Sequence, residues 1–402
     1  MKVVVMNSLY APYKGGGAEI VVKNVVSLLQ KAGHTVCVLT TKPLFDSQRL
    51  LEINGVRVRR ISPLNIFWFG NLGKHNVVLR CVWHMLDTFN LSGYFTIKKI
   101  LSEESPDIVL THNLKGLGYL TPYAVKRSGA RLVHTVHDVQ LFTPSGLIIK
   151  GQEETFTHTN FYTRVYRFFT KRLFVACDRV IFPSVFLKNF YTQRGFFASS
   201  VRDVIRNPVV NTGDPMPMGF SVKRKFHVDE KDPFRFLFLG QLEVHKGIYF
   251  LLDALQQSSK NFVLHIVGAG SEEETVRKKC QGDQRFIVHG YIPPEKLYEV
   301  FARIDMMIFP SLCYENFPTS ILDSFRFGVP VLASDMGGVP ELVSHGVNGF
   351  LFFAGDEDHF AERLDEIFLR RGVLNDWSRN AYKTFLTTQE FDYLGTVLAS
   401  DC

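Results

Sequence analysis

Two carboxylates stand eight residues apart where a predicted loop gives way to a predicted helix. Glu315 lies on the loop after an apolar strand, and Asp323 lies about one turn into the helix that follows. Backbone N–H groups at a helix start favour an anion, and carboxylates accept hydrogen bonds from sugar hydroxyls. The segment therefore suits a ligand with both phosphate and hydroxyl groups, although an ordinary helix-start acid and a surface aspartate would leave the same pattern.

A second segment combines glycines with a lysine at the end of another apolar strand. It reads Gly240-Gln241-Leu242-Glu243-Val244-His245-Lys246-Gly247. A glycine turn supplies N–H donors and the lysine supplies a point charge, which together suit a diphosphate. The segment is not a Walker A loop, because the order Gly-Lys-Ser/Thr is absent.

A third segment, Lys14-Gly15-Gly16-Gly17-Ala18-Glu19, follows the first predicted strand and opens a helix. Glycines let a ligand approach the backbone, and the helix start favours an anion. The dinucleotide pattern Gly-x-Gly-x-x-Gly is not matched, since position 20 is Ile. A flexible loop remains the alternative for this segment.

Alternating strands and helices must position these segments, as in parallel sheets flanked by helices. In the first half of the chain we expect a helix over Ala18–Lys31, closed by Gly33, and strands at Lys2–Met6, Val36–Thr40, Asp107–Thr111, Leu132–Val136 and Val180–Pro183. A Pro-rich polar stretch near 206–233 then interrupts the pattern, as a link between domains does.

A second α/β series follows this link. Strands are expected at Phe236–Leu239, Phe262–Val267, Met306–Phe309 and Val329–Ala333, and helices at Gly247–Gln257, Ser271–Lys279, Pro294–Arg303 and Ser320–Phe327. Ser271 and Glu274 have the spacing of a capping box. The fold class predicted is α/β, with two doubly wound domains and a ligand cleft between them.

Taken in order, these motifs resemble the retaining family-4 glycosyltransferases of the GT-B fold. The resemblance rests on the glycine-rich first loop, His137-Asp138 after a strand, Gly-x-Leu-x-x-x-Lys-Gly, the acid–x7–acid pair and Gly-x-Pro-Val at 328–331. It covers nearly the whole chain and is strongest from about 235 to 355. It implies two Rossmann-like domains, an acceptor-binding one at 1–210 and a nucleotide-sugar-binding one at 211–385, with segment 386–402 returning to the first.

The resemblance implies a donor site in the second domain. Lys246 would neutralise the diphosphate, with Gly240 and Gly16 beside it, and Gln241 replaces the family's usual Arg and brings no charge. Glu315 would be catalytic and face the donor sugar. Asp323, where the family usually has Glu, would bind the ribose, and Tyr291 and Ile292 would hold the nucleobase through their backbone. The loop Asn316-Phe317-Pro318-Thr319 would cradle the sugar and diphosphate.

In the first domain the resemblance places His137 beside the reacting sugar as a second catalytic residue. A satisfied structural histidine is the ordinary alternative. His112 and His134 are interpreted as structural or acceptor-side residues, and Asp138 as a residue that orients His137 or lines the cleft. The reaction implied is transfer of a sugar from a UDP- or GDP-type donor to a hydroxyl acceptor, with retention of anomeric configuration.

We expect no metal and no cofactor for this reaction. Asp356-Glu357-Asp358 has the D-x-D form of a metal signature, but it precedes a helix pattern at Phe360–Leu369, where acids cap the helix and favour its dipole. Lys246 and the helix start at 318–320 can hold a leaving diphosphate without a divalent cation.

Composition places the chain among ordinary globular proteins of two or three domains, with 46% hydrophobic residues in 402 and 36 Phe. No run of about 18 apolar residues is present, and the N-terminal apolar run is too short for a signal peptide. Six scattered cysteines without Cys-x-x-Cys fit reduced thiols rather than disulfides or zinc. We therefore expect a cytoplasmic protein, with the inner membrane face as a candidate peripheral location.

Charge is uneven along the chain. Residues 1–212 hold 27 Lys+Arg and 12 Asp+Glu, whereas 213–402 hold 19 and 27, and the total is +7. Solvated surface charge is one interpretation, and an anionic partner of the first half is the other. A run of alternating aromatic and cationic residues at 161–172 suits an anionic membrane surface, but an amphipathic helix packed on its sheet would look the same.

The expected acceptor is a glycan or a lipid-linked glycan of bacterial surface-polysaccharide or glycolipid synthesis. No nucleic-acid module is visible, so nucleic acid is not an expected partner. Two other functions stay open: a non-catalytic nucleotide-sugar-binding protein, and another GT-B enzyme such as a nucleotide-sugar epimerase or a pyridoxal-dependent phosphorylase. The Glu315/Asp323 loop argues against an epimerase, and the short chain argues against a phosphorylase.

Overall fold

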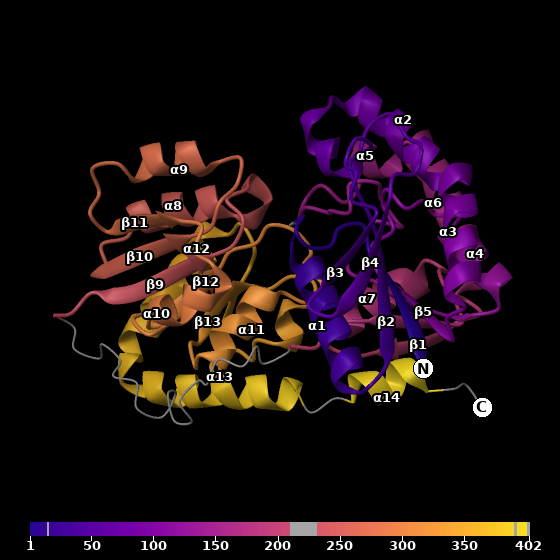
Figure 1. Cartoon of the computed structure of the whole chain (residues 1–402). Coiled ribbons are helices and arrows are strands. Elements are labelled where there is room, and N and C mark those ends of the chain that lie inside the picture. The colour runs from indigo at the N-terminus through magenta and orange to yellow at the C-terminus, as the bar shows by residue number, and fades with distance from the viewer. Residues whose placement is uncertain (14–15, 210–230, 390–391, 400–402) are drawn as a thin grey trace. The chain divides into compact units, whose positions relative to one another are not determined.

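The computed structural model describes residues 1–13, 16–209, 231–389 and 392–399 (Figure 1). Lys14 and Gly15 of the glycine-rich segment, and most of the expected interdomain link, lie outside the described residues. The chain divides into two compact units: unit 1 comprises 1–147, 154–211 and 391–402, and unit 2 comprises 148–153 and 212–390.

Unit 1 is built on an eight-stranded sheet in the order β3-β4-β2-β1-β5-β6-β7-β8. Every neighbouring pair is parallel except β3 with β4. The central strands are continuous apolar runs buried on both faces, which is typical of a parallel sheet covered by helices. The strands are β1 (Lys2–Met6), β2 (Thr35–Thr41), β3 (Leu50–Ile53), β4 (Val56–Ile61), β5 (Ile108–Thr111), β6 (Arg131–Thr135), β7 (Arg179–Phe182) and β8 (Val201–Val204).

Eight α-helices of unit 1 lie in the described part of the chain. The last of them packs into the same core as the first strands, through Tyr393 and Val397. The helices are α1 (Gly17–Lys31), α2 (Val77–Thr88), α3 (Leu91–Glu104), α4 (Thr121–Ser128), α5 (Phe156–Thr159), α6 (Phe161–Leu173), α7 (Val185–Gln193) and α14 (Tyr393–Leu398).

Unit 2 is built on a six-stranded parallel sheet in the order β11-β10-β9-β12-β13-β14. Its core is rich in phenylalanine, including Phe234, Phe236, Phe262 and Phe350. Its strands are β9 (Phe234–Leu239), β10 (Phe262–Val267), β11 (Phe286–Gly290), β12 (Met306–Phe309), β13 (Val331–Ser334) and β14 (Gly349–Phe352). The structure thus confirms two α/β units with parallel sheets.

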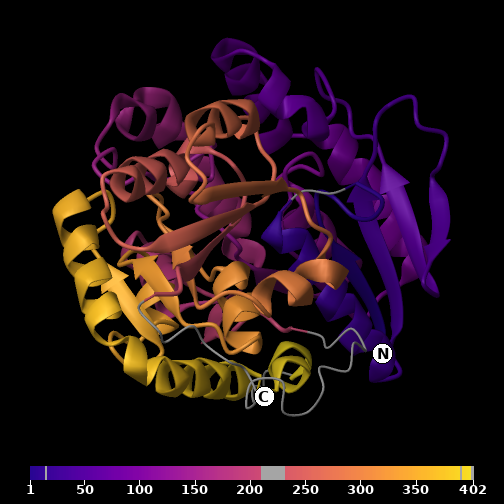
Figure 2. The same cartoon turned by 90° about the vertical axis from the view of Figure 1, so that its left-hand side faces the viewer.

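Helices cover both faces of this second sheet (Figures 1 and 2). α8, α9 and α12 contribute side chains to the phenylalanine core, while Phe301 of α10 stacks on Phe327 at the end of α11 at 4.8 Å. The helices are α8 (Ile248–Gln256), α9 (Glu273–Cys280), α10 (Leu297–Phe301), α11 (Thr319–Arg326), α12 (Glu357–Leu369) and α13 (Leu374–Thr388).

Two local predictions are corrected by the structure. Residues 148–153, assigned above to the first domain, pack in unit 2, where Lys150 N–H donates to the Leu312 carbonyl at 2.9 Å. The capping box was wrong, because helix α9 begins at Glu273 and both the N–H and the hydroxyl of Ser271 donate to Glu243, at 2.9 and 2.8 Å.

The cap predicted for the D-x-D string is confirmed. Asp356 precedes α12, and its carboxylate accepts a hydrogen bond from His359 N–H at 2.9 Å.

Candidate active site

Glu315 and Lys246 form the centre of a polar site in unit 2. Lys246 Nζ lies 2.6 Å from Glu315 Oε1, and both side chains are mostly buried, at 23% and 15% exposed. The lysine follows β9 and the glutamate follows β12, which are neighbours in the sheet. The carboxyl ends of adjacent parallel strands meet at one edge, where doubly wound sheets bind ligands.

Glu315 and Lys246 are held in their charged forms. Burial acts to raise the pKa of Glu315, but Lys246 and hydrogen bonds from Ser311 (2.8 Å) and Cys313 (3.4 Å) hold it below its ordinary value. Burial likewise acts to lower the pKa of Lys246, and Glu315 raises it above its ordinary value. An anion that reaches Lys246 therefore competes with Glu315 for the ammonium.

Cys313 is a thiol rather than a thiolate in this site. Burial, with the charge of Glu315, raises its pKa to about 12. Its sulfur therefore serves as a hydrogen-bond donor to Glu315, and not as a nucleophile.

The backbone around Glu315 depends on glycines in the left-handed region. Gly337 has φ +63°, and a Cβ there would lie 2.2 Å from the Glu315 carbonyl oxygen, which also accepts a hydrogen bond from Gly338 N–H at 2.7 Å. Gly247 has φ +75°, and its Cβ would lie 1.9 Å from the Pro310 carbonyl oxygen. These close approaches require glycine at both positions.

The start of α11 lies directly after Glu315. Asn316, Phe317 and Pro318 connect the glutamate to Thr319, where the helix begins, and no side chain caps that helix. Its first N–H groups are therefore available to an anion. Phe317 is buried, so it packs in the core and contributes to the site through its backbone.

Asp323 lies on α11, about one turn after its start. Burial raises the pKa of its carboxyl to about 6, against the opposing effect of Arg326. Among the described residues, no group donates a hydrogen bond to this carboxylate. A ligand hydroxyl is therefore a suitable partner for Asp323.

Gly240 and Gln241 follow β9 in the same unit. Gly240 N–H donates to the Val267 carbonyl at 3.1 Å, and a Cβ on Gly268 would lie 1.8 Å from the Gly240 carbonyl oxygen. This turn is therefore tightly built from backbone. The side chain of Gln241 is exposed.

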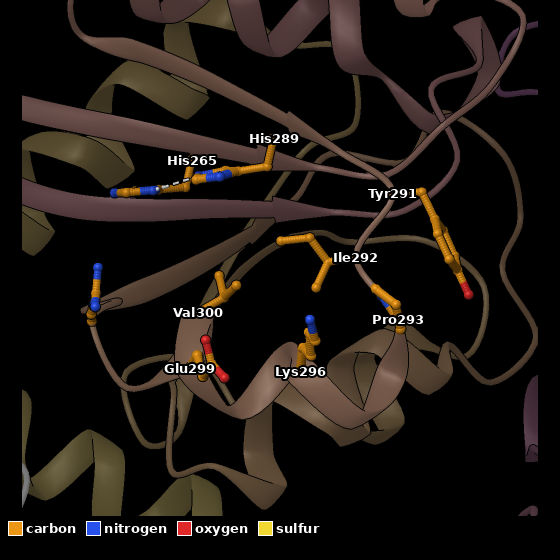
Figure 3. Close-up of a pocket in the computed structure, with 9 residues that line it drawn as sticks. His265, His289, Tyr291, Ile292, Pro293, Lys296, Glu299 and Val300 are labelled. Carbon is orange, nitrogen blue, oxygen red and sulfur yellow. Dashed lines mark hydrogen bonds between the residues drawn. The ribbon is translucent and has the colours of Figure 1, made fainter.

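Tyr291 and Ile292, the predicted nucleobase residues, follow β11 and line a cavity of about 310 Å³. Figure 3 shows the rings of His265 and His289 leaving the sheet on one side of this cavity, with Lys296 on a helical segment on the other. The two rings stack, with Nδ1 of His265 2.9 Å from Nε2 of His289. Neither Lys246 nor Glu315 lines this cavity.

In unit 1, His137 pairs with a second histidine that sequence reasoning did not assign to it. His112 Nδ1 lies 2.8 Å from His137 Nε2, and the rings stack at 5.0 Å. Burial lowers the pKa of His137 to about 4 and holds that of His112 well below its ordinary value. His137 is thus a neutral imidazole. His134 instead contacts Thr111 Oγ1 at 2.9 Å.

Gly16 lies at the start of α1 in unit 1. Its N–H donates to the Glu19 carboxylate at 2.6 Å. A diphosphate could bind this N–H only by displacing Glu19. Among the described residues, no group of three or more His, Cys, Asp or Glu has the arrangement of a metal site.

The structure thus brings together Lys246, Glu315, the start of α11 and Asp323 within unit 2, while His137 and Gly16 belong to unit 1. Sequence reasoning missed the hydrogen bonds of Ser311 and Cys313 to Glu315. The signal available was their position on the same loop, with Ser311 four residues and Cys313 two residues before the acid.

The fold is shared with solved GT-B glycosyltransferases. Sucrose-phosphate synthase from Thermosynechococcus elongatus superposes with a TM-score of 0.73 and 17% identity, covering 99% of this chain and 96% of that one. HepE of Anabaena, in complex with UDP and glucose, superposes with a TM-score of 0.69 and 20% identity over the whole of both chains.

Two family models match the sequence. The model of Glycosyltransferase Family 4 matches residues 15–210, and that of Glycosyl transferases group 1 matches residues 220–384, so that the two together span nearly the whole chain. The chain belongs to the family-4 type of glycosyltransferases with the GT-B fold.

Relatives of similar length share about a quarter of their residues with this chain. The lipopolysaccharide 1,6-galactosyltransferase of Salmonella typhimurium is 26% identical over 365 residues, which is 88% of this chain and 86% of the relative. An uncharacterized 42.6 kDa protein of the Klebsiella pneumoniae cps region is 26% identical over 345 residues, 85% and 87% of the two chains.

Proposed function

We propose that this protein transfers a sugar from a nucleoside diphosphate sugar to a hydroxyl acceptor with retention of anomeric configuration. The observation that carries the proposal is the Lys246–Glu315 pair beside the uncapped start of α11. A uridine nucleotide is the donor we favour, because the similar HepE binds UDP and glucose. Synthesis of a surface polysaccharide is the setting we favour, because the Salmonella relative is a lipopolysaccharide galactosyltransferase.

The site residues divide the work as follows in this proposal. Lys246 and the N–H groups of α11 stabilise the departing diphosphate, which is where negative charge develops. Glu315 stabilises the developing positive charge on the sugar. Asp323 binds the ribose hydroxyls. Because these groups can supply the charge that the reaction needs, we propose that no metal ion takes part.

Two groups interact with hydroxyls in this proposal, the leaving phosphate oxygen and His137. The leaving phosphate oxygen takes the acceptor proton on the same face of the sugar, which gives retention. His137, as a neutral imidazole, accepts a hydrogen bond from a sugar hydroxyl. For this role His137 Nε2–H donates to His112 Nδ1, so that His112 fixes the orientation of the His137 ring and His137 Nδ1 is the acceptor.

The acceptor we propose is lipid-linked, and unit 1 docks on an anionic membrane surface. Helix α2 and the segments next to it in sequence carry many exposed apolar side chains, and exposed apolar surface of this kind suits a membrane. Val78 is the most exposed residue of α2, at 72%. The exposed apolar residues of these segments are Leu64, Ile66, Val77, Val78, Leu79, Val82, Met85, Leu86, Phe89, Leu91 and Phe95.

Only part of the aromatic-cationic run at 161–172 lies at the surface of unit 1. Tyr166 is buried, and Arg167 lies 3.4 Å over the Phe142 ring, so half of α6 packs in unit 1. Phe161, at 81% exposed, remains at the surface. Because Tyr162 OH donates to the Cys81 carbonyl at 3.1 Å, α6 adjoins α2. No described helix is long and apolar enough to span a bilayer.

Turnover of the donor tests the proposal. The full chain is incubated with UDP-glucose, UDP-galactose and GDP-mannose, with and without membrane lipid extract from the source organism, and release of nucleoside diphosphate is measured. We expect release from one donor for the wild type and at least about a hundredfold less for Glu315→Gln, the size of effect seen when a transition-state charge contact is lost. Binding of all three donors without any release would make the chain a nucleotide-sugar-binding protein instead.

A further inference from the structure

A buried lysine at the ligand edge of the unit 1 sheet has no role in the mechanism above. Lys115 lies four residues after the end of β5, on the segment that begins with His112. Its side chain is only 9% exposed. Since β5 and β6 are adjacent and parallel, this segment and His137-Asp138 meet at the carboxyl edge of the sheet, where such sheets bind ligands.

The ammonium of Lys115 forms no hydrogen bond and no ion pair within 4.0 Å to any residue that the structure describes. Two carboxylates lie near it, the buried Asp87 of α2 and the half-buried Asp138, but each already accepts backbone hydrogen bonds. Gly116 N–H donates to both oxygens of Asp87, at 3.0 and 3.1 Å, and Gln140 N–H donates to Asp138 at 2.7 Å. The Lys115 side chain is thus mostly buried without a polar partner in the described structure, while its Nζ is not among the fully buried polar atoms and can be reached by a ligand or water.

Other unsatisfied polar atoms lie at the same edge. Nε2 of His112 and Oε1 of Gln140 are buried without a hydrogen-bond partner in the described structure. The backbone of Gly146, with φ +74°, lies close to the lysine, because a Cβ there would lie 3.4 Å from Lys115 Nζ and 3.5 Å from Asp138 Oδ2. The edge therefore places one ammonium near the acceptors Asp87, Asp138 and Gln140 Oε1.

Burial and the neighbouring charges shift the pKa values of these groups. Burial lowers the pKa of Lys115, and Asp138 and Asp87 oppose that effect while Arg80 adds to it. Burial raises the pKa of Asp87 to about 7, so this carboxyl can become neutral when a further negative charge arrives. His84 of α2, with its pKa lowered to about 3, adds no charge.

An ammonium surrounded by hydrogen-bond acceptors matches a sugar that carries an anionic group: the anion binds the lysine and the hydroxyls donate to the acceptors. We propose that the ammonium of Lys115 binds a phosphate or carboxylate group on the sugar acceptor and so selects anionic acceptors. This inference rests on the proposed transferase function. Phosphate would belong to a lipid-phosphate-linked acceptor, and carboxylate to an acidic sugar of a glycan.

Equilibrium dialysis of the full chain tests this assignment. UDP is kept at saturating concentration so that the Lys246 site is filled, and the probes are radiolabelled inorganic phosphate, glucuronate and glucose. The variants are Lys115→Met, Asp138→Asn, and Lys31→Met as a matched control on the exposed end of α1. UDP binding is measured separately for each variant, so that failure at the donor site is recognised independently.

We expect the wild type to bind phosphate or glucuronate more tightly than glucose, and Lys115→Met to weaken the anion about ten- to a hundredfold, as loss of a charged hydrogen bond does. Lys31→Met should bind like the wild type. Asp138→Asn should bind the anion more tightly, because it removes a competing charge, and this variant decides the matter if Lys115→Met does not fold. A preference for phosphate indicates the lipid-linked source, and a preference for glucuronate the acidic sugar.

Equal anion affinity in the wild type and Lys115→Met would overturn the assignment, as would an unchanged or weaker affinity in Asp138→Asn. Either result would make Lys115 a structural counter-ion of the two aspartates. Loss of UDP binding in the wild type would instead contradict the proposed donor site.

Discussion

Replacing Glu315 with glutamine should have opposite effects on donor binding and on turnover. The Glu315 carboxylate lies 2.6 Å from Lys246 Nζ, and an arriving diphosphate must compete for the same ammonium. Glutamine keeps the shape of the side chain but not its charge. Lys246 is then released to the diphosphate, and the sugar loses its carboxylate.

The size of each effect follows from the burial of the pair. Removing one partner of a fully buried ion pair costs about 3–5 kcal/mol. Glutamine still accepts a hydrogen bond and Lys246 is 23% exposed, so we expect a loss of stability of about 1–3 kcal/mol. Release of the lysine should tighten UDP binding by up to about tenfold, which corresponds to about 1.4 kcal/mol. Turnover should fall by about a hundredfold or more.

Calorimetric titration with UDP, together with thermal unfolding, measures both quantities. The variants are Glu315→Gln, Lys246→Met and the double variant, with Glu357→Gln at the exposed start of α12 as a matched control. Lys246→Met alone should weaken UDP about ten- to a hundredfold. The stability losses of the two single variants should not add in the double variant. Additive losses, or unchanged UDP affinity in both single variants, would refute the reasoning.

The other predictions concern pH, the membrane and metal ions. The pKa of Asp323 is raised to about 6, and ribose hydroxyls donate more strongly to the charged carboxylate. UDP-glucose affinity should therefore be full above that pH and fall below it. A calorimetric pH series on Asp323→Asn should show no such fall. The combined change Val78→Ser, Val82→Ser and Met85→Ser should lower pelleting with anionic vesicles about tenfold or more, since each substitution removes apolar contact area. The control is Leu369→Ser, at an 85% exposed residue of unit 2. Equal pelleting of the triple variant and the control would exclude α2 as the docking surface. UDP binding and transfer should persist in EDTA; a strict need for added manganese or magnesium would contradict the charge roles given to Lys246 and α11.

The positions of many strands could be predicted from apolar runs. The predicted strand bounds at Lys2–Met6, Phe262–Val267 and Met306–Phe309 agree with β1, β10 and β12, because each run is mostly apolar and is followed by Asn, Gly or Pro. The β3–β4 hairpin was not predicted, although Asn54-Gly55, both with positive φ, is a strong hairpin signal. The capping box failed because a distant residue, Glu243, took the Ser271 hydroxyl.

The contacts of the site could not be read from local pattern. Lys246 and Glu315 are 69 residues apart, and they meet because β9 pairs with β12 although two strands intervene in sequence. His112 and His137 meet for the same reason at β5 and β6. The resemblance named Lys246, Glu315 and His137 as candidates, but only the sheet order shows that Lys246 lies against Glu315 and His112 against His137.

Helix α2 links the two proposals made for the acceptor, because its two faces differ in chemistry. Val78, Val82 and Met85 point outward with helical spacing, and His84 and Asp87 are buried on the opposite side. The outward face supplies apolar area for a bilayer, and the inward face helps to set the charge around Lys115. A lipid-linked acceptor held at the outer face would therefore present its phosphate or sugar acid to the edge that the inner face supports. If this division is correct, changes at Val78 will alter vesicle binding but not phosphate binding, and changes at Lys115 will do the reverse.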